Sequence, residues 1–331
     1  MPIARARIAV LGDGGWGTTL AIHLHRLGHR VTLWGAFPDY VRLLDRTRRN
    51  PKYLPGVVIP RDLPISADLR QAVAGGNLLV LAVPSQHVRG VLRRLRGLPL
   101  SGVRIVNVAK GIEVGSLKRM SHVVEDVLGP RPYAILSGPN IAAEMATGHP
   151  ASSVVASTSR ALAVEVQQRF MSAQLRIYTS SDVVGVELGG ALKNPIAIAA
   201  GVSDGLGFGA NAKAALVTRG VVEMARLGAA MGAKRETFWG LSGLGDLLTT
   251  CLGGRNRALG ERIGKGERLA AILRRTPMVI EGVETSKAAV ALGHRYRIEL
   301  PILEQVHAIL FRGKSPRAAL RSLMQRTGKA E

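Results

Sequence analysis

Residues 7–21 read RIAVLGDGGWGTTLA, and this stretch decides the fold of the first half of the chain. An apolar run ends in glycines at positions 12, 14 and 17, and a helix-like pattern then continues to Gly28. A strand, a tight turn and a helix in this order form the first part of a dinucleotide-binding unit. Gly12 permits the turn, Gly14 lets the backbone approach a pyrophosphate, and Gly17 lets the helix pack closely on the strand. The stretch predicts a cofactor of the NAD or NADP type, whose phosphates favour the helix N-terminus; the alternative is a glycine turn with a structural role alone.

The composition limits the class of protein. A chain of 331 residues suggests about two domains, and a hydrophobic fraction of 47% is enough for large cores. The single cysteine, Cys251, excludes a disulfide framework and a cysteine-based zinc site. Histidines do not occur at metal-ligand spacing, so no metal is predicted. We expect a cytoplasmic protein without a signal peptide or a transmembrane segment, because the chain enters a strand at once and lacks a run of about 18 uncharged apolar residues.

The net charge of +22 raises the question of an anionic partner. The basic residues are scattered, with local concentrations at 42–52, 89–96 and 312–326. Aromatic residues make up only 4% of the chain, which is too few for a base-stacking surface. We therefore expect solvated basic faces that attract anionic small molecules, and no nucleic-acid partner.

The pattern of apolar runs changes near residue 181. Before it, near-continuous apolar strands alternate with helical segments, which indicates a parallel sheet covered on both faces; the strands are expected at 7–11, 30–34, 78–84, 103–108, 134–137, 151–156 and 175–179. After it, Asp182 is placed to cap a long helix, and strand patterns nearly vanish. Helices are expected at 211–227, 257–263, 269–273, 285–292, 302–310 and 316–324. The sequence predicts an α/β fold: an N-terminal Rossmann-type doubly wound sheet (1–181) and a C-terminal all-helical domain for substrate and catalysis (182–331).

Two polar segments follow predicted strands, at the sheet edge where ligands bind in open α/β folds. Lys110 comes directly after the strand at 103–108, and Ser137-Gly138-Pro139-Asn140 follows the strand at 134–137. Lys110 is a candidate for ligand binding, the alternative being an exposed lysine in a turn. For the second segment, the alternative is a turn followed by a helix N-cap at Asn140.

The helical half carries a lysine and an aspartate in unusual surroundings. Lys193 lies within ELGGALKNP (187–195), among small and apolar residues. Such surroundings tend to lower the pKa of a lysine and suit acid–base catalysis, although a lysine reaching out to solvent fits as well. Asp246 lies within LSGLGDLLTTC (241–251), where it is placed to orient a catalytic group or to cap the next helix.

A further candidate is the segment GGRNR at 253–257. The glycines allow close approach, and Arg255 offers a bidentate fork for a phosphate, whereas Arg257 is the weaker candidate. Glu281, within VIEG (279–282), is a candidate for ligand binding or a surface carboxylate.

Taken in order, these motifs resemble one known family. They are GDGGWGTTLA (12–21), AKGIE (109–113), SGPN (137–140), GGALKN (189–194), GFGAN (207–211), GLGDL (243–247) and RN (255–256). The set is similar to NAD(P)-dependent glycerol-3-phosphate dehydrogenase of the bacterial type, from about residue 8 to residue 323. Each motif alone is of limited specificity, whereas their occurrence in this order is very specific.

The resemblance implies a reaction and a role for each matching residue. The reaction is reversible hydride transfer between NADH or NADPH and dihydroxyacetone phosphate, which gives sn-glycerol 3-phosphate for phospholipid synthesis. Lys193 matches the catalytic acid–base, and Asp246 a carboxylate of the same site. The other implied substrate contacts are Lys110, Gly138, Asn140, Arg255 and Asn256. The implied cofactor contacts are Gly12, Gly14, Gly15, Trp16, Gly17, Lys110, Ala142, Arg255, Val279 and Glu281. The family also suggests a homodimer.

The chain departs from the family pattern at two places. Members often carry Arg or His just after the second strand, at the 2′-phosphate of NADP, whereas this chain has Gly35 and Ala36. It also lacks there the acid of an NAD-selective site, so the sequence leaves the choice between NADH and NADPH open, with Arg42 and Arg46 as substitute candidates. At the second place, Gly254 replaces a serine in a shortened loop, which removes a hydroxyl contact to the substrate phosphate.

Two other classes of function fit part of the sequence. A related dehydrogenase of the 6-phosphogluconate, β-hydroxyacid or ketopantoate type shares the expected domains and the lysine. Arg255-Asn256 after the GLGD segment favours the phosphate substrate instead. A non-catalytic nucleotide sensor or nucleic-acid-binding protein is the other alternative, and the presence of Lys110, Lys193 and Asp246 argues against it.

Overall fold

The computed structural model describes residues 5–276 and 278–328, which form two compact units. The first unit contains the chain up to Lys110 together with Lys118–Glu187. The second contains Gly111–Leu117 and the chain from Leu188 onward. The division falls inside a single helix, α8 (Val183–Gly205), rather than before it. The short segment Gly111–Leu117 belongs with the helical unit although it lies within the α/β half of the sequence.

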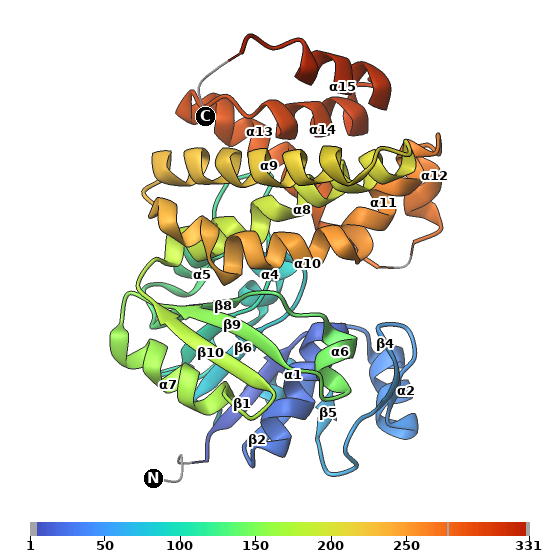
Figure 1. Cartoon of the computed structure of the whole chain (residues 1–331). Coiled ribbons are helices and arrows are strands. Elements are labelled where there is room, and N and C mark those ends of the chain that lie inside the picture. Colours follow the sequence, from blue (N-terminus) through green and yellow to red (C-terminus); the bar gives the residue numbers. More distant parts are fainter. Residues whose placement is uncertain (1–4, 277, 329–331) are drawn as a thin grey trace. The chain divides into compact units, whose positions relative to one another are not determined.

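The first unit is built on an eight-stranded sheet with the strand order β10-β9-β8-β7-β6-β1-β2-β5 (Figure 1). Its strands are β1 (Arg7–Leu11), β2 (Arg30–Trp34), β5 (Ile65–Ser66), β6 (Leu78–Leu81), β7 (Arg104–Asn107), β8 (Tyr133–Ser137), β9 (Ala151–Ala156) and β10 (Leu175–Ser180). All seven strands expected from the sequence are present, with ends that differ by up to three residues. Two short strands outside this sheet, β3 (Arg49–Asn50) and β4 (Leu54–Val58), pair with each other.

One strand pair corrects the expectation of a parallel sheet. β8 and β9 are antiparallel, with Leu136 opposite Val155, while the other pairs of the sheet are parallel. The chain between them contains only the five-residue helix α6 (Ala142–Ala146). A parallel neighbour requires a crossover that spans the sheet, which so short a helix does not provide.

Helices cover both faces of the sheet, as the doubly wound fold requires. α1 (Gly15–Arg26), α6 and α7 (Arg160–Phe170) contribute to the core of one face. α3 (Leu69–Val73), α4 (Ser85–Arg94) and α5 (Met120–Leu128) contribute to the core of the other, and α2 (Pro38–Thr47) follows β2. The alternation of side chains along a strand explains the two cores. In β1, for example, Val10 packs into the first core and Leu11 into the second.

The second unit contains no strand among its described residues. Besides α8, it contains α9 (Ala210–Ala230), α10 (Asp246–Leu252), α11 (Arg255–Gly264), α12 (Leu269–Arg274), α13 (Glu281–Tyr296), α14 (Pro301–Phe311) and α15 (Pro316–Met324). A 3₁₀ turn (Arg235–Trp239) and a π-helical turn (Leu241–Gly245) precede α10. The all-helical domain is thus confirmed, while α10 was missed because its start reads as glycine turns. The predicted cap of α8 is present, since the backbone N–H of Gly185 donates to Asp182 Oδ1 at 2.8 Å.

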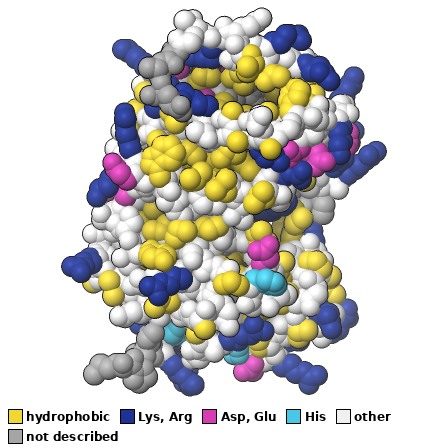
Figure 2. All heavy atoms as spheres, viewed as in Figure 1, with side chains coloured by type: hydrophobic (Ala, Val, Ile, Leu, Met, Phe, Trp, Pro, Cys, Tyr) yellow, Lys and Arg dark blue, Asp and Glu magenta, His cyan; other side chains and the backbone are white. Residues whose placement is uncertain are grey.

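Helix α8 is long and apolar enough to cross a membrane by length and composition alone. In the structure, however, 89% of its apolar window is buried within the protein. That burial is expected of the central helix of a folded domain. Figure 2 shows Lys and Arg side chains at many places on the visible face.

Glu223 of α9 is a buried acid that links stability to pH. Its side chain is 3% exposed, and its two oxygens accept from the backbone N–H groups of Ile302 and Leu303 at 2.8 and 3.2 Å. Burial raises the pKa of Glu223 to about 7, against the opposing effect of these two hydrogen bonds.

We therefore expect the stability that Glu223 contributes to be lost as the pH rises. Between its ordinary pKa and about 7, the folded state binds more protons than the unfolded state, so the free energy of unfolding falls with pH. From pH 5 to pH 8 the loss is roughly 2 kcal/mol relative to Glu223→Gln. Urea unfolding of both proteins at the two pH values measures it. Equal pH dependence in the two proteins would contradict the assignment.

Candidate active site

The glycine turn of the first unit has the shape that a dinucleotide pyrophosphate requires. Gly12 has φ +128°, and a Cβ there would lie 2.7 Å from the carbonyl carbon of Ala82. A Cβ on Gly17 would lie 1.9 Å from the carbonyl oxygen of Gly12, so neither position accepts a side chain. A Cβ on Gly14 would have no atom within 4 Å, which leaves space for a ligand beside the backbone. α1 begins at Gly15 without a side-chain cap, so its first N–H groups favour an anion.

A buried asparagine that the sequence did not single out holds this turn. Asn50 is 1% exposed, and its Nδ2 donates to the carbonyl oxygen of Asp13 and to Thr18 Oγ1, both at 2.8 Å. Its Oδ1 accepts from the hydroxyl of Tyr40 at 2.6 Å. These bonds fix the turn to the β3–β4 hairpin. No motif marks Asn50, because it lies far along the chain in a stretch rich in proline and arginine.

Lys110 and the 137–140 segment meet at the carboxyl ends of their strands. The Nζ of half-buried Lys110 donates to the carbonyl oxygen of Gly138 at 3.0 Å, so Lys110 is not simply an exposed lysine in a turn. Asn140 does not cap α6, whose N-cap is Ile141. Its side chain instead accepts from Ser153 Oγ at 2.9 Å. Lys110, Gly138 and Asn140 are therefore held together against β9.

The same edge of the sheet is connected to the cofactor turn. Thr19 of α1 donates from Oγ1 to the carbonyl oxygen of Ala142 at 3.1 Å. Gly15 and Trp16 lie in the first turn of the same helix. The first unit thus brings the predicted cofactor residues of α1 and Ala142 next to the segment with Gly138 and Asn140.

In the second unit, Lys193 and Asp246 form a buried ion pair. They are 5% and 2% exposed, and Lys193 Nζ donates to Asp246 Oδ1. It also donates to Thr250 Oγ1 at 2.7 Å. Lys193 is therefore not a lysine that reaches out to solvent. Asp246 is the first residue of α10 rather than its N-cap, which is Gly245.

Close packing of α8 on the π-helical turn places this pair. Gly189 lies one helical turn before Lys193, and a Cβ there would lie 2.8 Å from the carbonyl oxygen of Ser242. Ser242 in turn precedes Asp246 by four residues. The glycine therefore allows the backbones to approach until the lysine reaches the carboxylate. Thr250, which the sequence analysis missed, follows Asp246 by four residues, and this helical spacing was the available signal.

Asn256 is tied to the same helix. Its Nδ2 donates to Asn194 Oδ1 at 2.9 Å, and its Oδ1 accepts from the backbone N–H of Gly282 at 3.0 Å. Helices α8 and α11 pack closely, since a Cβ on Gly260 of α11 would lie 2.0 Å from the carbonyl oxygen of Ile198 in α8. Asn194, next to Lys193, is a second residue that the sequence analysis passed over.

Arg255 lies near the two other residues predicted at the cofactor. Its guanidinium donates to the carbonyl oxygen of Val279 at 2.8 Å. Desolvation lowers the pKa of Arg255, and the nearby Glu281 carboxylate opposes this shift. Arg257, by contrast, pairs with Asp204 at 2.7 Å. One group in the second unit is therefore formed by Arg255, Val279 and Glu281. Arg257 instead forms an ion pair with Asp204.

The loop before Arg255 explains one departure from the family pattern. Gly254 has φ +95°, a backbone conformation that a serine rarely adopts. This backbone conformation favours glycine over serine at position 254. Among the described residues, no group of three or more His, Cys, Asp or Glu side chains is placed to hold a metal ion.

A glycine turn shaped for a pyrophosphate and a buried lysine–aspartate–threonine group in a helical unit define a nicotinamide-dependent dehydrogenase with a helical substrate domain. Comparison with known proteins gives the family. The N-terminal model of NAD-dependent glycerol-3-phosphate dehydrogenase matches residues 7–163, and its C-terminal model matches residues 182–321. The chain belongs to this family, which confirms the resemblance seen in the sequence.

Individual relatives agree with the family models. The chain is 47% identical to glycerol-3-phosphate dehydrogenase [NAD(P)+] of Thermoanaerobacter sp. (strain X514) over 327 residues, which covers 98% of each chain. The crystal structure of glycerol-3-phosphate dehydrogenase from Coxiella burnetii is 37% identical, with a TM-score of 0.94 over 97% of this chain and 99% of that one. A ketopantoate reductase from Ralstonia eutropha, at 18% identity and a TM-score of 0.60 over 96% and 100% of the chains, shares the fold alone.

Proposed function

We propose that this protein catalyses the reversible NAD(P)H-dependent reduction of dihydroxyacetone phosphate to sn-glycerol 3-phosphate. Family membership over nearly the whole chain supports the reaction. The observation that carries it is the buried group of Lys193, Asp246 and Thr250, which holds an ammonium in one direction. Reduction of a ketone requires a proton donor at the developing alkoxide, and an oriented ammonium is such a donor.

The proposed mechanism assigns a separate role to each group. A bound NAD(P)H supplies the hydride to C2 of the substrate. Lys193 protonates the C2 oxygen as charge develops on it, and takes the hydroxyl proton back in the reverse direction. Asp246 and Thr250 position the Lys193 ammonium and are thus positioning residues. Because their bonds exist before substrate binds, little reorganisation is needed during the reaction.

The substrate phosphate requires cationic and polar partners. We assign this role to Lys110 and Arg255, with Gly138, Asn140 and Asn256 as further substrate contacts. Arg255 suits a phosphate because its planar guanidinium forms two parallel hydrogen bonds. Asn256 is already fixed by Asn194 and Gly282, so its position is set before substrate binds.

Arg255→Ala is expected to raise the KM for dihydroxyacetone phosphate about 10- to 100-fold, since a hydrogen bond to a charged group contributes about 1.5–3 kcal/mol. Initial rates at varied substrate and saturating cofactor measure it. The control is Arg257→Ala, which removes an arginine of the same helix that pairs with Asp204. An unchanged KM for Arg255→Ala would exclude Arg255 from phosphate binding.

The reaction itself is tested by absorbance of the nicotinamide band with dihydroxyacetone phosphate, with NADH and NADPH run in parallel. Oxidation of either cofactor supports the proposal. A folded, cofactor-binding sample without turnover would overturn it, and 3-hydroxy acids and ketopantoate would be the next substrates to test.

The cellular setting is part of the same proposal. The product would supply glycerophospholipid synthesis, in the cytoplasm, where the single buried Cys251 stays reduced. We also propose a homodimer, the oligomeric state that the family suggests. Sedimentation equilibrium tests the dimer, and a monomer at micromolar concentration would exclude it.

A further inference from the structure

The ends of β1 and β2 lie side by side at the edge of the sheet where the cofactor is proposed to bind. Leu11 and Trp34 are in register, and the backbone N–H of Gly12 donates to the carbonyl oxygen of Trp34 at 2.9 Å. Asp13 follows Gly12 and Gly35 follows Trp34, so Asp13 and Gly35 are neighbours beyond the ends of the two strands. In dinucleotide-binding folds, an acid at the end of the second strand accepts a hydrogen bond from the ribose 2′-hydroxyl of NAD. This chain has Gly35 and Ala36 at that place.

The side chain of Asp13 occupies the space that this acid leaves. A Cβ on Gly35 would lie 2.4 Å from Asp13 Oδ2 and 2.6 Å from a methyl group of Val41. The carboxylate of the glycine turn therefore sits where a side chain at the end of β2 would begin. Gly35 and Asp13 fit each other, because any side chain at 35 would displace the carboxylate.

One oxygen of the buried Asp13 carboxylate has no hydrogen-bond partner among the described residues. Asp13 is 8% exposed, and this oxygen is Oδ2. Burial raises the pKa of the Asp13 carboxyl, an effect opposed by a hydrogen bond from its own backbone and by the charge of Lys52. Buried polar atoms without a partner are rare in native proteins and call for a specific explanation, which a donor from a ligand provides.

We propose that Asp13 replaces the missing acid of β2: its carboxylate accepts the 2′-hydroxyl of the adenosine ribose and selects NADH over NADPH. This inference rests on the cofactor class of the proposed function and adds the choice within it. The 2′-hydroxyl of NADH can donate a hydrogen bond to the Asp13 carboxylate. The 2′-phosphate of NADPH would instead be repelled, because both groups are negatively charged.

An adjacent cavity suits the rest of the adenosine. It has a volume of about 440 Å³ and is lined by Phe37, Asp39, Tyr40, Leu43, Lys52 and Tyr53. Aromatic and aliphatic walls suit a planar base. Lys52 is the cation that favours a 2′-phosphate, but it is exposed, with Nζ 4.9 Å from the centre of the Tyr53 ring. Solvent and salt screen an exposed charge more than a buried one, so we expect the effect of Asp13 to dominate.

The test measures dissociation constants of NADH and NADPH by isothermal titration calorimetry, without substrate, for the wild-type protein and Asp13→Asn. We expect the wild-type protein to bind NADH more tightly. In Asp13→Asn, the ratio of the two constants should move at least tenfold toward NADPH. Gly35→Ala should shift the ratio in the same direction, because its methyl group displaces the carboxylate.

Asp45→Asn is the matched control, since Asp45 of α2 is outside the lining of the cavity, pairs with Arg48 and has a side chain that is 54% exposed. An unchanged ratio in Asp13→Asn would overturn the proposal, as would an equal shift in Asp45→Asn, which would reflect net charge alone. A wild-type preference for NADPH, or no binding of either dinucleotide, would also overturn it. This test measures binding and not turnover, so it is independent of the reaction. If the binding ratio shifts as expected but the protein does not reduce dihydroxyacetone phosphate, the proposed reaction is refuted and the role of Asp13 stands.

Discussion

Lys193→Ala is expected to lower kcat about 10²- to 10⁴-fold, the range that a positioned general acid contributes. Without the ammonium, the developing C2 alkoxide would have to take its proton from water. The glycine turn belongs to the other unit, where Asn50 and Thr18 hold it through hydrogen bonds to the carbonyl oxygen of Asp13. The dissociation constant for the preferred cofactor should therefore stay within a few-fold of the wild-type value. Stopped-flow measurement of a single turnover, together with calorimetric titration of the cofactor, separates the two effects.

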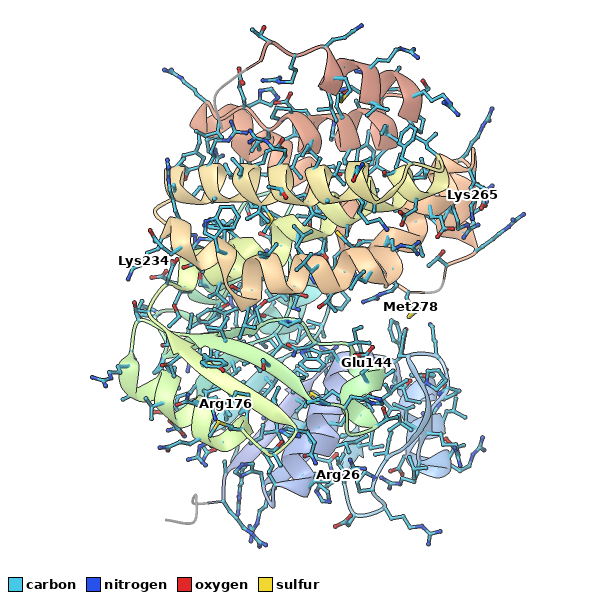
Figure 3. All side chains as sticks on the ribbon, viewed as in Figure 1. Arg26, Glu144, Arg176, Lys234, Lys265 and Met278 are labelled. Carbon is cyan, nitrogen blue, oxygen red and sulfur yellow. The ribbon has the colours of Figure 1, made fainter. Side chains whose placement is uncertain are left out.

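The matched control removes a lysine–carboxylate pair that has no proposed role. Lys265, labelled in Figure 3, pairs with Glu261 on the surface of the second unit, and its side chain is 61% exposed. Lys265→Ala should leave both kcat and cofactor binding unchanged, since exposed pairs contribute little. If Lys193→Ala turns over at a rate close to that of this control, Lys193 is not the acid–base.

The sequence predicted those parts of the structure that depend on local pattern. The glycines at 12, 14 and 17 and the alternating cores of β1 follow from spacing alone. The prediction of a fully parallel sheet was wrong at the β8–β9 pair, because strand direction depends on how the connection packs and not on the strands themselves. The helix α10 was missed because two glycines before Asp246 read as a loop.

The same distinction holds for the candidate site. Lys193, Asp246 and Arg255 carry charge in apolar or glycine-rich surroundings, which makes them visible in the sequence. Asn50 and Asn194 are neutral residues whose importance comes from hydrogen bonds to distant parts of the chain. Their partners are known only once the chain has folded. Thr250 is the exception, since its helical spacing from Asp246 was there to be seen.

Asp246→Asn is expected to reduce both activity and stability, because it removes the carboxylate that pairs with the buried Lys193 ammonium. Removing one member of a buried ion pair costs about 3–5 kcal/mol of stability. We expect kcat to fall by at least tenfold, since the ammonium loses its fixed direction.

A double-mutant cycle of Asp246→Asn with Lys193→Ala tests whether Asp246 acts by positioning Lys193 or acts on the substrate independently. If Asp246 acts through Lys193, the double variant should be no slower than Lys193→Ala alone. It should also be more stable than Asp246→Asn, since the buried ammonium is removed together with its carboxylate. The measurements are kcat and the free energy of urea unfolding for the four proteins. Additive losses of kcat would show that Asp246 acts on the substrate independently, and the role assigned to the buried pair would then be wrong.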